Sequence, residues 1–114
     1  MAIEHSDAFQ ALEKFSASFE RQPVNFPVVQ DEVGTVFARP ITCGEFDKLA
    51  QYKGHEYNVR LCMAALERED GKPVFKPEDF AGLYSAGRGT AMIFAQAAGA
   101  IVLAQKVDFD AIKK

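Results

Sequence analysis

Few residues of this 114-residue chain have the type and spacing that catalysis or metal binding requires. Cys43 stands in the first turn of a predicted helix, where the helix dipole favours a thiolate, and His55 is the candidate base for it. Nothing in the sequence brings these two side chains together, so a small residue filling a helix start is the plainer interpretation. A metal site would need several ligands at close spacing, but His5 and His55 are far apart and Cys62 belongs to no CxxC pair. We therefore predict no catalytic residue and no metal site.

Two other segments resemble binding sites only superficially. Residues 87–90 read Gly-Arg-Gly-Thr, which lacks the glycine spacing and the lysine of a phosphate-binding loop, so we interpret them as a connection between helices. Glu67, Glu69 and Asp70 form a cluster of carboxylates that is typical of a solvated helix end. No cofactor is expected, and the sequence favours a protein that is not an enzyme.

Composition limits the class of protein. The length predicts one domain, residues 1–114, and the hydrophobic (48%) and charged (25%) fractions are typical of a globular protein. A formal charge of −3 without a basic cluster argues against a nucleic-acid surface. Two cysteines are too few for a disulfide scaffold, so we predict two buried, reduced thiols.

The sequence predicts neither a signal peptide nor a membrane-spanning helix. The first residues lack the basic and apolar regions of a signal peptide. Residues 91–104 are the most apolar stretch, and this stretch is shorter than the ~20 residues that span a bilayer. We therefore expect a cytoplasmic protein with no membrane partner.

Residues 59–80 are the stretch around which the other elements are predicted to pack. Residues 61–66 are all apolar, which predicts a helix that is buried on every side, with Leu61 and Leu66 in the core. Asp70-Gly71 is expected to end that helix, and the Lys-Pro-Glu-Asp of residues 76–79 to begin the next one.

An amphipathic helix is predicted over residues 7–20. Asp7 and Gln10 are its expected capping pair, and its apolar residues recur at helical spacing: Phe9, Leu12, Phe15 and Phe19. Two interpretations are open. The helix either packs on the core, or it is loosely attached through a hinge at residues 20–23 and presents its phenylalanines to a partner.

Residues 24–39 change to a period of two, which predicts a β-hairpin with its turn at residues 29–32. Pro23 and Pro27 restrict the first strand to a sheet edge. Thr42 and Glu45 then form a capping box, the clearest local signal in the sequence, and Gly54 is expected to close that helix.

The final helix is predicted to begin at Thr90, or already at Ser85, and to end near Lys106, followed by a frayed tail at residues 107–114. Small residues recur along it every four positions: Ala91, Ala95 and Gly99. This stripe suits close helix contact, either as an internal packing seam or as an interface between copies. The expected fold is therefore α+β and mainly α-helical, with a small N-terminal β-hairpin packed on about four helices and preceded by an N-terminal helix.

From Gly34 onward the sequence resembles the tail assembly chaperones of long-tailed bacteriophages and prophages. That family commonly has a strand written Gly-x-Val-x-x-Arg-Pro-Leu-Thr followed by Gly-Glu, and residues 34–45 read GTVFARPITCGE. It also has an apolar helix ending in Glu-Asp-Gly-Lys, a Pro-x-Phe turn and a Glu-Asp helix, and residues 69–79 read EDGKPVFKPED.

The resemblance implies a non-enzymatic protein that binds the tape-measure protein, keeps it soluble and helps to recruit the tail-tube (major tail) protein. It also implies a location in the cytoplasm of the bacterial host and absence from the mature virion. We expect partner binding through apolar surface, with the Phe stripe suited to the client and the small-residue stripe to self-association; the residues concerned are Phe9, Phe15, Phe19, Ala91, Ala95 and Gly99.

The alternative is a small helical regulatory or protein-interaction domain of the helix-turn-helix type, with its turn at Asp70-Gly71. Glu78 and Asp79 at the start of the would-be recognition helix argue against it, because DNA phosphates would repel them.

Overall fold

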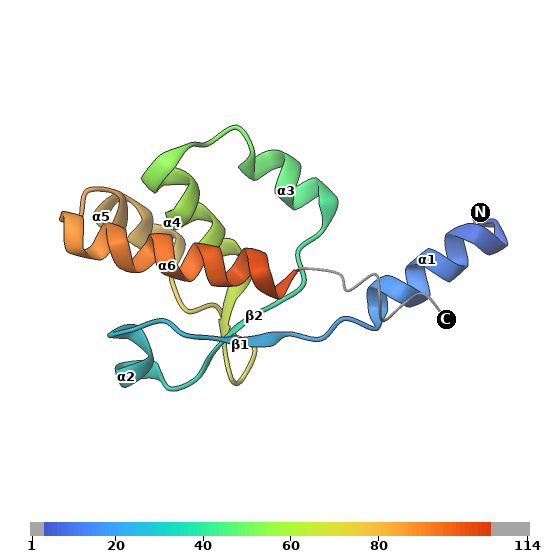
Figure 1. Cartoon of the computed structure of the whole chain (residues 1–114), viewed down its shortest axis with the longest axis horizontal. Helices are drawn as coiled ribbons and strands as arrows, with labels where there is room; N and C mark the ends of the chain where they lie inside the picture. The colour runs from blue at the N-terminus through green and yellow to red at the C-terminus, as the bar shows by residue number, and fades with distance from the viewer. Residues whose placement is uncertain (1–3, 106–114) are drawn as a thin grey trace.

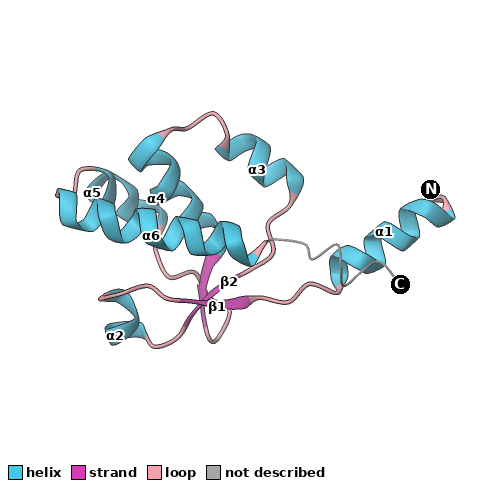
Figure 2. Cartoon of the chain, viewed as in Figure 1, coloured by secondary structure: helices cyan, strands magenta, loops and turns pink. Residues whose placement is uncertain are grey.

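The computed structural model describes residues 4–105 and shows the expected α+β, mainly helical fold (Figures 1 and 2). Helices pack above a small antiparallel sheet, and one helix at the N-terminus extends away from them (Figure 1). The elements are, in chain order, α1 (Asp7–Ala17), β1 (Gln22–Val24), α2 (Val29–Val33), β2 (Val36–Ala38), α3 (Cys43–Leu49), α4 (Gly54–Ala65), β3 (Leu66–Arg68), a 3-10 turn η1 (Pro77–Asp79), α5 (Phe80–Tyr84) and α6 (Arg88–Ala104).

The sheet has three strands in the order β1-β2-β3, one more than the predicted hairpin. Pro23 pairs with Phe37 on the edge strand β1, as its missing N–H requires. On the other side of β2, Ala38 pairs with Leu66 of β3. The chain between β1 and β2 is longer than a tight turn. Helix α2 occupies all of the predicted turn, residues 29–32, and Val28 before it adopts φ 74°.

The prediction of a central helix reaching Asp70 was wrong in its second half. Helix α4 ends at Ala65, and Leu66 enters β3, where it is buried against the sheet. Pairing with β2 satisfies the backbone of residues 66–68, and local periodicity does not reveal such a distant partner. Leu61 and Leu66 are nevertheless core residues, as predicted.

Asp70 and Gly71 form a turn after β3 rather than a helix end. Gly71 has φ 85° and its N–H donates to the Arg68 carbonyl at 2.9 Å, while the Arg68 N–H donates to the Lys72 carbonyl at 2.8 Å. The predicted left-handed glycine is confirmed, but a strand precedes it instead of a helix. A helix-turn-helix centred here is therefore absent from the described residues.

Helices α4 and α6 pack against each other along their length and form the core together with the sheet (Figure 1). Phe94 of α6 contacts Phe26 and Phe75, with ring centroids 5.5 and 5.7 Å away. The buried residues are Val24, Phe26, Val36, Ala38, Leu49, Val59, Leu61, Cys62, Ala65, Leu66, Phe94, Ala97, Ala98 and Ile101.

The connection from β2 to α3 is held by side-chain hydrogen bonds. The capping box is confirmed, because Thr42 Oγ1 accepts from the Glu45 N–H at 3.1 Å and Glu45 Oε1 accepts from the Thr42 N–H at 3.0 Å. The Gln105 side chain joins the end of α6 to the same loop: its amide nitrogen donates to the Arg39 carbonyl and its oxygen accepts from the Ile41 N–H, both at 3.1 Å. Helix α3 ends at Leu49, earlier than predicted.

The terminal helices differ from their predicted bounds by a few residues. Ser6, rather than Asp7 with Gln10, caps α1, since its hydroxyl accepts from the Phe9 N–H at 3.1 Å. Helix α1 ends at Ala17 and α6 begins at Arg88, after the predicted break. The predicted tail, residues 107–114, lies outside the described residues.

Candidate partner-binding surfaces

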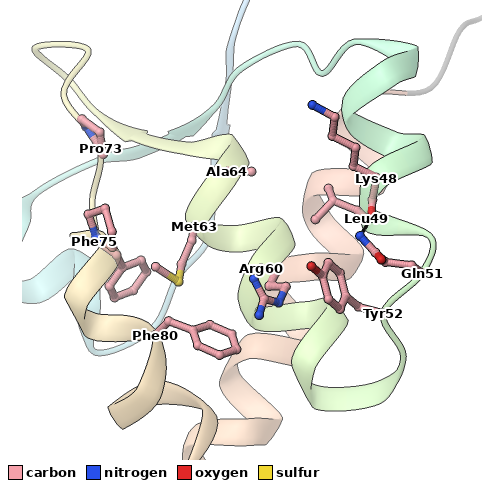
Figure 3. Close-up of a pocket in the computed structure, with 11 residues that line it drawn as sticks. Lys48, Leu49, Gln51, Tyr52, Arg60, Met63, Ala64, Pro73, Phe75 and Phe80 are labelled. Carbon is pink, nitrogen blue, oxygen red and sulfur yellow. Dashed lines mark hydrogen bonds between the residues drawn. The ribbon is translucent and has the colours of Figure 1, made fainter.

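An open groove of about 550 Å³ lies between α3, α4 and the segment that leads into α5 (Figure 3). Met63 and Ala64 of α4 form its floor, and Phe75 and Phe80 stand on one side of it. The full lining is Lys48, Leu49, Gln51, Tyr52, Arg60, Met63, Ala64, Pro73, Phe75, Pro77 and Phe80. A concave, mainly apolar surface of this kind can bind a peptide, a helix or a small molecule.

Arg60 crosses one end of this groove between two aromatic rings. Its guanidinium carbon lies 4.2 Å from the Tyr52 ring centroid and 4.1 Å from that of Phe80 (Figure 3). Its Nε also donates to Glu56 Oε2 at 2.9 Å. These contacts hold the two sides of the groove together, and they leave Lys48 as the lining cation without an ion pair among the described residues.

The Phe stripe of α1 faces solvent. No residue of α1 is buried, and Leu12 is the most open position of the stripe at 67% exposure, beside the partly exposed Phe9, Phe15 and Phe19. Interpreting α1 as a helix packed on the core is therefore wrong. The interpretation as a loosely attached helix fits the structure better.

Within residues 4–105, the C-terminal end of α1 and Phe19 just beyond it lie against the rest of the protein. Phe15 and Phe19 line a cavity of about 300 Å³ together with Ile41, Phe46 and Ala104. The predicted hinge is shorter than residues 20–23, because Arg21 is already fixed: its guanidinium donates to the carbonyls of Arg68 and Glu69 at 3.0 and 2.8 Å, and to Glu67 Oε1 at 3.2 Å.

The small-residue stripe of α6 does not form the internal seam. The face of α6 that is buried carries Phe94, Ala97, Ala98 and Ile101, whereas Ala95 and Gly99 are exposed and Ala91 is half-buried. Helix packing there uses Phe94 and Ala98, one position before the predicted Ala95 and Gly99, together with Ala97 and Ile101. The outer face of α6 is apolar, since Met92, Val102 and Leu103 are exposed beside Ala95 and Gly99.

The two residues considered for nucleophilic catalysis lie apart. Cys43 is exposed, contrary to the prediction, and lines the cavity next to Ala104 near the end of α6. His55 contacts Phe94, and its Nε2 lies 2.9 Å from the Leu83 carbonyl. Phe94 and Ala104 are ten residues apart on one helix, or about 15 Å, so the thiol and the imidazole do not meet.

Cys62 is fully buried in α4, and this burial raises the pKa of its thiol to about 12. Both cysteines are free, as predicted. Within residues 4–105, no group of three or more His, Cys, Asp or Glu side chains is arranged to hold a metal ion.

Sequence reasoning missed the groove because three distant segments, residues 48–52, 60–64 and 73–80, build it. No spacing rule connects such segments. The Leu49, Met63 and Phe80 side chains each had the pattern of a core residue, and only the tertiary arrangement leaves a hollow among them.

Among the described residues, no helix is both long and apolar enough to span a membrane. Comparisons of this chain with family models, with curated proteins and with solved structures found no match.

Proposed function

We propose that this protein is a tail assembly chaperone of a long-tailed phage or prophage, which binds the helical tape-measure protein and keeps it soluble. The observation that carries the proposal is α1, a capped helix that buries no residue and leaves Phe9, Leu12 and Phe15 exposed. Phe19, also exposed, follows two residues after the helix ends at Ala17. Contiguous exposed apolar surface of this kind is typical of an interaction site.

The residues behind the family resemblance support the proposal by their structural roles. Arg39, Thr42 and Glu45 of the first block make the junction between β2 and α3. Gly71 of the second block makes the turn after β3, and Pro77 begins η1. Both blocks thus contribute to the scaffold, and the Phe stripe and the outer face of α6 lie outside them.

Aromatic side chains suit the proposed task because they bury large apolar areas and anchor interfaces. A long helical client offers a repeated apolar face, and a stripe with residues three and four apart can pack along such a face. In this proposal the Phe stripe binds the client in the host cytoplasm, the tail-tube protein is recruited to the complex, and the finished virion lacks the chaperone. The outer face of α6 is the second candidate surface.

Co-expression with the tape-measure gene of the same tail cluster tests the proposal. We expect the wild-type protein to keep the client in the soluble fraction. Phe15→Asp and Ala95→Glu are the test variants for the two surfaces, and Gln10→Asp is the matched control on the polar side of α1.

A client that stays insoluble with the wild-type protein would refute the chaperone proposal. If both test variants fold, as checked by circular dichroism, and still solubilise the client, the function stands and neither surface is the binding site. Loss of activity in Phe15→Asp but not in Gln10→Asp would assign the client to the Phe stripe.

A further inference from the structure

Two apolar surfaces on separate parts of the molecule remain largely exposed among the described residues. One is the Phe stripe, which is carried by a helix that leaves the body of the protein, away from α4 and α5 (Figure 1). The other is the groove of Figure 3, which opens between α3, α4 and the start of α5. Exposed apolar areas of this kind tend to associate.

We propose that α1 of one copy of this protein lies in the groove of a second copy, so that the copies associate head to tail. This proposal concerns the protein without its client. The two surfaces are different patches, so the contact is heterologous and can add further copies at either end.

The surface chemistry of the two partners agrees. Helix α1 has 11 residues and is therefore about 16 Å long. Its stripe presents Phe and Leu side chains on one side, in the pattern of a helix that docks into a groove. The groove offers Met63, Phe75 and Phe80, and both aromatic–aromatic and sulfur–aromatic contacts are favourable.

Charge also favours this occupant. The charged residues that line the groove are Lys48 and Arg60, both cations, and Glu56 already pairs with Arg60. Glu13 follows Phe9 by one helical turn, so its carboxylate stands at the edge of the stripe. A docked α1 can therefore bring Glu13 to Lys48, whereas Lys14 lies on the opposite side of the helix.

The attachment of α1 directs it outward. Arg21 fixes the chain after α1 to the turn that follows β3, and α1 extends from there away from the body (Figure 1). Phe9 and Leu12 lie on the half of α1 that is farthest from that anchor. They are placed to meet a neighbouring molecule.

Self-association of this kind would cover the stripe until a client displaces it. That consequence rests on the proposed function, because it assumes that the client binds to the same stripe. The association itself can be measured on the protein alone, so the two proposals can fail separately.

Sedimentation velocity of the full chain over a wide range of concentration is the test. We expect the wild-type protein to associate as its concentration rises. Leu12→Glu and Met63→Glu should each raise the dissociation constant about 30-fold or more, the effect of losing an interface anchor. Gln10→Glu on the polar side of α1 and Met92→Glu on the outer face of α6 are the matched controls and should associate like the wild type.

Mixing the two defective variants gives the decisive result. The Leu12→Glu chain retains an intact groove and the Met63→Glu chain retains an intact helix, so an equimolar mixture should form 1:1 pairs that do not grow further. If Met63→Glu fails to fold, Lys48→Glu replaces it as the groove variant, and Glu13→Lys should restore its binding in a mixture.

A wild-type protein that is monomeric at every concentration would overturn the proposal. So would a mixture that stays monomeric, because an intact α1 and an intact groove would then have failed to pair. Association of the Met63→Glu chain alone would overturn it too, since that result would indicate pairing between two α1 helices. Dissociation by Met92→Glu or Ala95→Glu would place the interface on α6 instead and would equally overturn it.

Discussion

Both terminal nitrogens of the Arg39 guanidinium donate hydrogen bonds to the carboxylate of Glu45, and one of them lies 3.1 Å from Oε1. This pair joins the end of β2 to the first turn of α3. Arg39 Nε also donates to the Ala64 carbonyl at 3.0 Å, near the end of α4. One side chain thus connects three elements, and lysine could not replace its forked geometry.

Stability should depend on pH through Glu45. The hydrogen bond from Arg39, followed by that from the Thr42 N–H, lowers the pKa of Glu45 from its ordinary 4.5 to about 2. A carboxylate with a lowered folded-state pKa stabilises the protein above its unfolded-state pKa, and this contribution is lost as the pH falls from about 4.5 towards 2.

Glu45→Gln measures that contribution, because glutamine retains the capping box but not the charge. Urea unfolding between pH 6 and pH 2 brackets the pKa shift from roughly 4.5 to 2. At the upper end of this range the wild type should be more stable than Glu45→Gln. The difference in unfolding free energy between the two proteins should shrink towards the lower end. A difference that does not change with pH would show that the ion pair contributes nothing to the pH dependence.

Leu61→Ala should cost about 2–5 kcal/mol of unfolding free energy, because Leu61 is 0% exposed and its truncation leaves a cavity. Thr42→Ala should cost only about 1 kcal/mol through the lost cap. Denaturant melts of the two variants give the comparison. If Thr42→Ala proves the more harmful change, the core is not centred on α4.

Gly71→Val should destabilise the protein by about 1–2 kcal/mol, because a β-branched residue resists the left-handed backbone at φ 85°. Apart from the adjoining residues, no atom lies within 4 Å of the position that a Cβ would take, so the penalty comes from the backbone. Gly71→Asn is the control, since asparagine tolerates this conformation, and it should lose much less in thermal unfolding. Equal losses in both variants would mean that the left-handed turn is not the cause.

The two thiols should differ in reactivity. Cys43 is exposed, whereas Cys62 is buried and burial raises its pKa to about 12, so little reactive thiolate forms there. A thiol reagent should label one group per chain in the native protein and two after denaturation. Cys43→Ser should abolish the native labelling, and rapid native labelling that survives this change would contradict the buried position of Cys62.

Helices α1, α3 and α6 and the core positions Leu61 and Leu66 followed from the sequence, because capping residues and apolar spacing act locally. Thr42 with Glu45 marked the start of α3, and Leu61 marked the core of α4. Strand β3 did not follow, since Leu66 belongs to an apolar run that suits a helix equally well. Whether Leu66 joins a helix or a strand depends on its pairing with Ala38, which is distant in sequence.

The surfaces were predicted unevenly for a related reason. A stripe on one helix can be read from its period, so the phenylalanines of α1 were found, but periodicity alone cannot distinguish a stripe that faces the core from one that faces solvent. On α6 the stripe of Ala95 and Gly99 suggested an internal seam, while Phe94 and Ile101 form the buried face. The groove needs three distant segments and had no local signal.

The projecting α1 has a thermodynamic consequence for any partner that it binds. An isolated helix of 11 residues is only marginally stable in water, and α1 buries no residue that would add packing energy. A partner that covers Phe9 and Leu12 must therefore also supply the free energy that orders this helix. Calorimetric titrations should then show coupled folding and binding, with a large negative heat-capacity change and a favourable enthalpy that is offset by lost entropy.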